Sequence, residues 1–97
     1  MNQYLFDISL PEHLTEEFVS LIPQQRAQVD TLMVKGVVTS YCLSFDRSKL
    51  WITMNADSED QAKEIIASFP LARFFRAKLY PLAFHNMTIS LTKVSLN

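Results

Sequence analysis

Residues 37–55, VVTSYCLSFDRSKLWITMN, predict a β-hairpin at the centre of this chain. Side chains alternate along 37–45, and a second strand-like run follows at 50–55, which is the period of two that strands produce. The run 46–49 between them is polar and is typical of a hairpin loop. One face of the first strand is expected to carry Val37, Thr39, Tyr41, Leu43 and Phe45, and the other Val38, Ser40, Cys42 and Ser44.

A helix is expected before the hairpin. Thr15 is a suitable N-cap, and Glu16 and Glu17 follow it in the first turn, where the helix dipole favours acidic side chains. Gly36, the one glycine of the chain, stands where a helix C-cap belongs. Pro23 lies inside the segment and is expected to kink the helix or to start a second helical segment. The apolar positions at near-helical spacing are Phe18, Ile22, Val29, Leu32 and Met33.

A second helix is expected after the hairpin. Ser58, with Gln61 three residues later, fits a capping box, in which each residue satisfies a backbone N–H of the first turn. Pro70 then ends the segment. The expected buried stripe is Ala62, Ile65, Ile66 and Phe69.

Strands are expected at both ends of the chain. Residues 4–10 alternate until Pro11 interrupts them. Residues 77–84 predict a fourth strand, and Pro81 within it favours an edge position or a bulge, because proline has no N–H to give to the ladder. Residues 87–96 alternate again. An exposed strand of that length would be an unprotected edge, so we expect it to pair with an edge strand, within the subunit or across a dimer.

The predicted order, β-α-β-β-α-β with an extra C-terminal strand, is that of an α+β, ferredoxin-like sandwich. Residues 1–97 have the length of a single domain. Two helices are expected to cover one face of a four-stranded antiparallel sheet. The strands carry apolar residues on both sides and the mean hydropathy is +0.07, so the other face is expected to pack against a second subunit in a homodimer or higher homo-oligomer.

Charge and composition disfavour several partners and cofactors. The net charge is −1, no segment concentrates basic charge, and the Lys/Arg-Gly-aromatic motif of RNA-binding sheets is absent, so no nucleic-acid partner is expected. Residues 1–14 lack the basic start of a signal peptide, and no apolar run has the ~18 residues of a membrane span. We therefore expect a cytoplasmic protein with no membrane partner. Two histidines and one cysteine, without metal-binding spacing, predict no metal and no cofactor.

Residues 69–85, FPLARFFRAKLYPLAFH, resemble the C-terminal segment of the muconolactone isomerase family. In that family a helix ends in a Leu-Pro-Leu-type turn, a short aromatic stretch follows, and the last strand leads to a histidine. The N-terminal part is similar as well, with a strand ending in Leu10-Pro11, a long polar helix and a glycine before the second strand. The resemblance covers roughly residues 3–86. It implies the dimeric α/β-barrel superfamily, a pocket between helices and sheet, and a 1,3-proton shift on a small unsaturated lactone.

Two residues are candidates for acid–base catalysis of such a shift. His85 has a side chain that titrates near neutral pH and is a candidate base or acid. Asp7 lies among apolar residues of the first strand, an environment that can raise a carboxyl pKa and make it a base. Each has an ordinary explanation too. His85 is also explained as a hydrogen-bonded surface histidine, and Asp7 as an ion-paired edge or interface residue.

Four residues are candidates for substrate binding. Arg73 and Arg76 flank two phenylalanines and are suited to hold a carboxylate, although a solvated turn explains them equally well. Tyr41 and Tyr80 are candidate donors to an oxyanion, and both are also explained as core or interface aromatics. Trp51 is expected in the core or an interface.

The two leading hypotheses are an isomerase-like enzyme and a non-catalytic, oligomeric small-molecule-binding module of the same fold. An RNA-binding sheet is the third and weakest. A pocket on which Asp7, His85, an arginine or a tyrosine converge favours the enzyme, whereas a pocket filled by Phe and Leu side chains favours the module.

Overall fold

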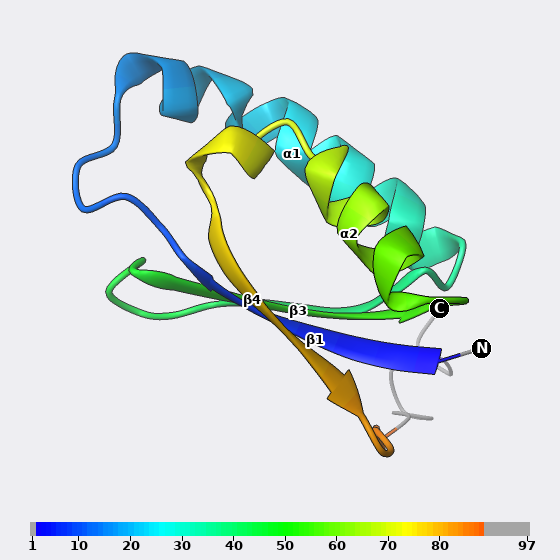
Figure 1. The fold of residues 1–97 in the computed structure, drawn as a ribbon. Helices are drawn as coiled ribbons and strands as arrows, with labels where there is room; N and C mark the ends of the chain where they lie inside the picture. The colour runs from blue at the N-terminus through cyan, green and yellow to red at the C-terminus, as the bar shows by residue number, and fades with distance from the viewer. Residues whose placement is uncertain (1, 89–97) are drawn as a thin grey trace.

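The computed structural model describes residues 2–88 as a four-stranded antiparallel sheet with two helices on one face (Figure 1). This arrangement confirms the predicted α+β, ferredoxin-like fold. The elements in chain order are β1 (Asn2–Ser9), α1 (Glu16–Val34), β2 (Val38–Leu43), β3 (Lys49–Ala56), α2 (Glu59–Ala67), the 3-10 helix η1 (Ala72–Phe74) and β4 (Arg76–Leu82).

The strands lie in the order β2-β3-β1-β4, so β1 is central and β4 is an outer edge. Phe6 on β1 lies opposite Ile52 on β3 and Leu79 on β4. Pro81 lies on β4 opposite Tyr4, which confirms the predicted edge position. An edge strand tolerates proline because half of its backbone groups have no partner to lose.

Helix α1 begins and ends where its sequence predicts. The Thr15 hydroxyl oxygen accepts a hydrogen bond from the Phe18 N–H at 3.1 Å. At the other end Gly36 has φ +75°, and the N–H groups of Gly36 and Val37 donate to the carbonyls of Met33 and Leu32, which is a Schellman cap. One helix runs through Pro23, so the second helical segment that Pro23 allowed does not form.

Helix α2 begins with one of the two bonds of the predicted capping box. The Ser58 hydroxyl oxygen accepts from the Gln61 N–H at 3.1 Å, whereas the Gln61 side chain accepts from the N–H of Asp57, one residue before Ser58. The helix then buries Ala62 and Ile66 against the sheet. The chain turns at Pro70 and continues into η1.

Strand β2 departs from the expected alternation. Val38 lies opposite Met54, but Ser40 lies opposite Thr53, so one extra residue is inserted between them as a β-bulge. The bulge brings Val38 to the same face as Tyr41, whereas a strict period of two assigned them to opposite faces. That assignment of Val38 was wrong, and the physical reason is burial: the shift places the valine in the core, where it is 2% exposed.

The core lies between the sheet and the helices. Ile8, Ile52 and Met54 are completely buried there, and fully burying an aliphatic side chain of this size contributes about 1.5–3 kcal/mol. The other members of this buried cluster are Tyr4, Phe6, Val29, Val38, Leu50, Ala56, Ala62, Ile66 and Phe69.

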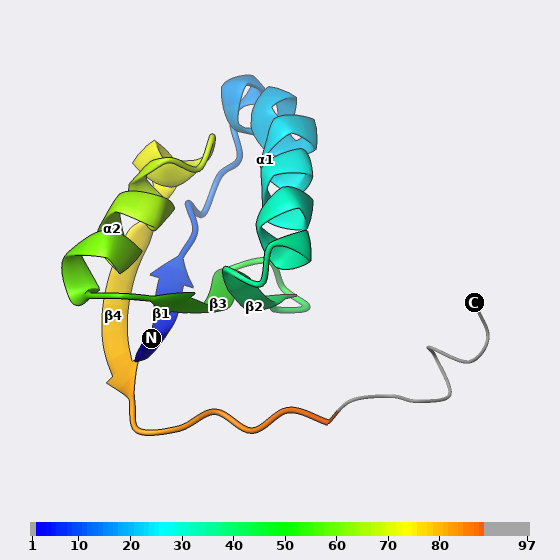
Figure 2. The ribbon, with the colours of Figure 1, turned by 90° about the vertical axis from the view of Figure 1, so that its right-hand side faces the viewer.

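The opposite face of the sheet carries no helix (Figure 2). We call it the open face, and the register places Leu5, Asp7, Trp51 and Tyr80 on it. Trp51 is 36% exposed, so of the two expected positions, core or interface, the core is excluded within this subunit. Beyond β4, residues 83–88 run on the open-face side (Figure 2).

The fifth strand expected over residues 87–96 falls mostly outside the described residues. Met87 and Thr88 are not part of a strand, and residues 89–97 are not described. Neither α-helix within residues 2–88 has the length and apolarity to cross a membrane.

Candidate functional site

A cleft of about 770 Å³ lies between helix α1 and the β2–β3 hairpin. We call it the α1–β2 cleft. Its apolar wall comes from one side of α1, where Phe18, Ile22, Val29 and Met33 repeat at helical spacing, and Leu43 and Leu50 close it from the hairpin. The volume falls within the range of small-molecule sites in proteins, about 300–1,000 Å³.

A buried amide provides the polar wall of the α1–β2 cleft. Gln25 is 2% exposed. Its side-chain oxygen accepts a hydrogen bond from the Leu71 N–H at 3.1 Å, and its Nε2 donates to the Tyr41 hydroxyl oxygen at 3.3 Å. Gln25 therefore connects α1 to the turn after α2 and to strand β2.

Burial raises the pKa of Tyr41 above its ordinary value of 10.0, although the hydrogen bond from Gln25 and the positive charge of Arg26 act in the opposite direction. The phenol therefore stays protonated at neutral pH. A protonated phenol beside an apolar cavity is a potential hydrogen-bond donor to a bound oxygen atom.

Three charged residues also line the α1–β2 cleft. Arg26 and Asp30 come from α1, and Arg47 comes from the hairpin loop. Arg47 has φ +63°, a left-handed conformation that a tight turn imposes. The Asp46 carboxylate holds this turn, since its Oδ1 accepts from the Ser48 N–H at 3.0 Å and from the hydroxyls of Ser44 and Ser48, both at 2.7 Å.

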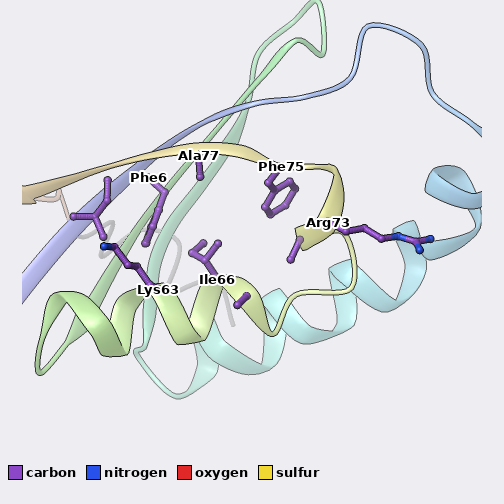
Figure 3. Close-up of a pocket in the computed structure, with 9 residues that line it drawn as sticks. Phe6, Lys63, Ile66, Arg73, Phe75 and Ala77 are labelled. Carbon is purple, nitrogen blue, oxygen red and sulfur yellow. The ribbon is translucent and has the colours of Figure 1, made fainter.

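A second cleft of about 580 Å³ lies between α2 and β4 (Figure 3). Phe6, Ile66, Phe75 and Leu79 give it an apolar lining, and Lys63 contributes the one ammonium group. Lys63 lies 3.7 Å from the Glu59 carboxylate. No buried hydrogen-bonding side chain contributes to this lining, in contrast to Gln25 in the α1–β2 cleft.

Arg73, a predicted carboxylate ligand, borders the second cleft but points out of it. Its side chain runs towards α1 (Figure 3), where the guanidinium pairs with Glu17. The guanidinium also lies 4.9 Å from the centre of the Phe74 ring. Phe74 in turn contacts Phe18 edge to face at 5.2 Å between ring centres. In this conformation Arg73 attaches η1 to the start of α1.

Asp7, a predicted base, lies on the open face. Its carboxylate is 3.1 Å from the Lys49 ammonium, and the Asp7 side chain is 29% exposed. Lys49 also donates to the Ser9 hydroxyl at 3.1 Å. This is the ion-paired alternative for Asp7, and Asp7 lines neither of the two clefts.

Arg76 and Tyr80 are on the same side of the sheet as Asp7. The register places Arg76 opposite Ser9 and Tyr80 opposite Leu5, and Lys78 lies 5.3 Å from the Tyr80 ring centre. His85 follows β4 in the segment that runs along the open-face side and is half-buried. None of these residues lines either cleft.

The six predicted site residues are thus divided between the two faces of the sheet. Tyr41 alone lies in the α1–β2 cleft. Four polar residues of the cleft were not predicted from the sequence: Gln25, Arg26, Asp30 and Arg47. A signal existed for Gln25, because this polar residue continues the helical spacing of Phe18, Ile22 and Val29 at a position that the pattern predicts to be buried.

Within residues 2–88, no three His, Cys, Asp or Glu side chains are grouped closely enough to hold a metal ion. Cys42 is a free, exposed thiol on β2, opposite Trp51. The polar groups in the lining of the α1–β2 cleft are a phenol, an amide, a carboxylate and two guanidinium groups around an apolar space.

Comparison with known proteins establishes the fold. No protein-family model matches the chain, and no curated protein matches it. Among solved structures, the chain is similar to 5-chloro-2-hydroxyhydroquinone dehydrochlorinase (TftG) from Burkholderia phenoliruptrix AC1100, in complex with 2,5-dihydroxybenzoquinone. The identity is 13% and the TM-score 0.70, over 86% of this chain and 95% of that one. This chain therefore shares its α+β, ferredoxin-like fold with that structure.

Proposed function

We propose that this protein binds a small cyclic carbonyl compound in the α1–β2 cleft and moves a proton on it, in the manner of a muconolactone isomerase. The observation that carries the proposal is the buried Gln25–Tyr41 pair in the wall of an apolar cavity of about 770 Å³. An apolar space with a few oriented polar groups is the usual form of a small-molecule site.

The charges around the cleft support a ligand that carries oxygen atoms at more than one position. Arg26 and Arg47 suit a carboxylate or an ionised hydroxyl, and Tyr41 suits a carbonyl or lactone oxygen. The fold likeness gives independent support, since TftG was solved with a hydroxylated quinone, which is a small ring with carbonyl oxygens.

A 1,3-proton shift needs a base next to an acidic C–H and a donor to the enolate oxygen that develops. In the cleft, Asp30 is the carboxylate available as the base and Tyr41 the donor. The base removes a proton from one carbon, the enolate forms, and the protonated base, whose proton can exchange with solvent, returns a proton to the carbon two positions away. Asp7 and His85 stay predictions for this step, because neither lines a cleft in the subunit.

The proposed assembly is a homodimer formed through the open face. Leu5, Trp51, Tyr80 and Leu82 on that face are all partly or largely exposed in the single subunit. A second copy packed against this face would bury them and would also enclose the Asp7–Lys49 pair.

The binding experiment is a ¹H–¹⁵N NMR titration with muconolactone and, separately, with 2,5-dihydroxybenzoquinone. We expect shifts at Gln25, Tyr41 and their neighbours on α1 and β2. Leu43→Trp fills the cleft from an exposed lining position and is expected to abolish them. Val34→Trp is the matched control, because Val34 is 89% exposed and lines neither cleft. Absence of any shift with both compounds would contradict the proposal.

The turnover experiment follows deuterium exchange into muconolactone by ¹H NMR in D₂O. Asp30→Asn and His85→Ala separate the two candidate bases, and loss of the correct one is expected to slow exchange by about 10²–10⁴-fold. Binding without exchange would favour the non-catalytic binding module, the alternative supported by the absence of Asp7 and His85 from both clefts.

A further inference from the structure

The side-chain amide of Gln25 can form its two hydrogen bonds in only one orientation. The Leu71 backbone N–H is a donor and nothing else, so the atom of Gln25 that faces it at 3.1 Å is the side-chain oxygen. The amide nitrogen must then face Tyr41, 3.3 Å away. A backbone group thus fixes the orientation of an amide whose two ends are otherwise nearly interchangeable.

The orientation of Gln25 determines the role of the Tyr41 hydroxyl. An amide NH₂ can only donate, so the Tyr41 oxygen accepts, and its own O–H proton is not used in this bond. Among the side-chain hydrogen bonds of the described residues, the Tyr41 hydroxyl takes part in this one only. Tyr41 and its partner Gln25 both line the α1–β2 cleft, so the cleft is where the hydroxyl proton can find an acceptor.

We infer that Gln25 fixes Tyr41 as a hydrogen-bond donor to the α1–β2 cleft, so that the ligand is selected by an acceptor oxygen: a carbonyl, an enolate or a phenolate. The inference rests on the proposed function, since it assumes that the cleft binds a ligand. It makes Gln25 a positioning residue, which acts on the ligand through Tyr41.

The charges near the cleft agree with this selection. Arg26 and Arg47 contribute positive charge to the lining, which favours an oxygen that carries or develops negative charge. Asp30 is the acidic member of the lining and suits a C–H or O–H of the same ligand. An alcohol that must donate its own proton has no acceptor at Tyr41 unless the Gln25 bond is broken.

The test uses 4-nitrophenol, a small ring whose single hydroxyl oxygen donates in the phenol and only accepts in the phenolate. The absorbance of the phenolate reports its ionisation in solution and in the complex. In the unmodified protein we expect the phenolate to bind about tenfold more tightly than the phenol or better, the factor expected of a hydrogen bond to a charged acceptor. The pKa of the bound probe would fall accordingly.

Three variants separate the contribution of the fixed donor from that of the arginines. Tyr41→Phe removes the donor and leaves Arg26 and Arg47 in place. Gln25→Glu presents carboxylate oxygens to both Leu71 and Tyr41, so the Tyr41 proton turns away from the cleft. Gln24→Glu adds the same charge at an exposed neighbouring position of α1 and is the matched control. The phenolate preference should fall in the first two and persist in the third, with folding checked by circular dichroism.

The outcomes are distinguishable. Equal binding of the two forms, a preference for the phenol, or an unchanged preference in Tyr41→Phe overturns the inference and leaves the proposed ligand site intact. No binding of either form to the unmodified protein contradicts the proposed function itself, and the inference with it. If Gln25→Glu fails to fold, the inference is tested by comparing the phenolate preference of Tyr41→Phe with that of the unmodified protein.

Discussion

The two sides of strand β1 have different compositions, although they alternate along the same eight residues. Towards the helices, Tyr4, Phe6 and Ile8 are at most 5% exposed. Towards the open face, Leu5 and Asp7 are only half-buried. The covered side is apolar because its partners, the two helices, belong to the same chain and exclude water.

The open face combines groups that need water or a partner. Asp7 pairs with Lys49, Lys78 lies over the Tyr80 ring, and Trp51 stays 36% exposed. Tyr and Trp are enriched in protein–protein interfaces whereas Lys and Asp are depleted, so it is the aromatic residues of the open face that favour the proposed dimer. One strand can thus stabilise the fold through one side and leave its other side available for the proposed dimer.

The largest effect is expected when neighbouring residues of β3 that face opposite sides of the sheet are truncated one at a time. Ile52→Ala should lower the free energy of unfolding by about 2–5 kcal/mol, because it opens a cavity at a fully buried position. Urea unfolding should show this loss at every protein concentration. Trp51→Ala should show a loss that depends on concentration, since it acts through assembly. If the two variants lost the same free energy of unfolding at every protein concentration, the two faces of the sheet would not have different roles.

A charge on the open face tests assembly directly. Leu5→Lys should weaken the proposed dimer by about thirtyfold or more, as expected when a central interface residue contributes 2 kcal/mol or more. Sedimentation equilibrium measures the change. Val34→Lys places the same charge on an exposed position of α1 and should leave the mass unchanged. A stable monomer in the unmodified protein would contradict the proposed dimer.

Removing the Asp7–Lys49 ion pair should have a smaller effect than the substitutions at Ile52 and Leu5. Both side chains are partly exposed, so Asp7→Asn should cost no more than about 1 kcal/mol of stability, the upper range for a solvated ion pair. The measurement is urea unfolding below the concentration at which the protein associates. Asp60→Asn, on the exposed start of α2, is the control. A loss of several kcal/mol would mean that the open face is already a desolvated environment in the single subunit.

The smallest effect is expected at the hairpin tip, which belongs to neither face. Hydrogen bonds from Ser48 and Ser44 lower the pKa of Asp46 from 3.8 to about 2. A carboxyl with a lowered folded-state pKa stabilises the folded state above its unfolded value and loses that contribution as the pH falls towards 2. The stability difference between the unmodified protein and Asp46→Asn should therefore shrink between pH 4 and pH 2. A constant difference over that range would show that the carboxylate does not stabilise the turn.

The fold was predictable because its signals are local. Thr15, Ser58 and Gly36 fix helix ends through bonds to residues only a few positions away. The β2 bulge was not predictable from alternation, since it is set by how Val38 packs against the rest of the core. Register and face depend on partners that are distant in sequence.

The site was harder to predict than the fold. Tyr41 was identified as a candidate donor, but only tertiary packing brings it to Gln25, 16 residues away in sequence, and brings Gln25 to the Leu71 N–H, 46 residues away. Asp7 and His85 were selected by residue type and position. The register then placed Asp7 on the open face, and neither Asp7 nor His85 lines either cleft. Residue chemistry can be read from a sequence, but which cavity a side chain enters depends on strand register.

The two outer strands also determine how this sheet resists aggregation. β4 carries Pro81, which offers no N–H to a neighbouring strand, and β2 carries a bulge that interrupts its regular ladder. Both edges are therefore poor templates for adding a strand from another molecule, which is the step that leads from native sheets to fibrils. A crowded solution of this protein should accordingly favour contacts through the surface of the sheet over end-to-end growth along its edges.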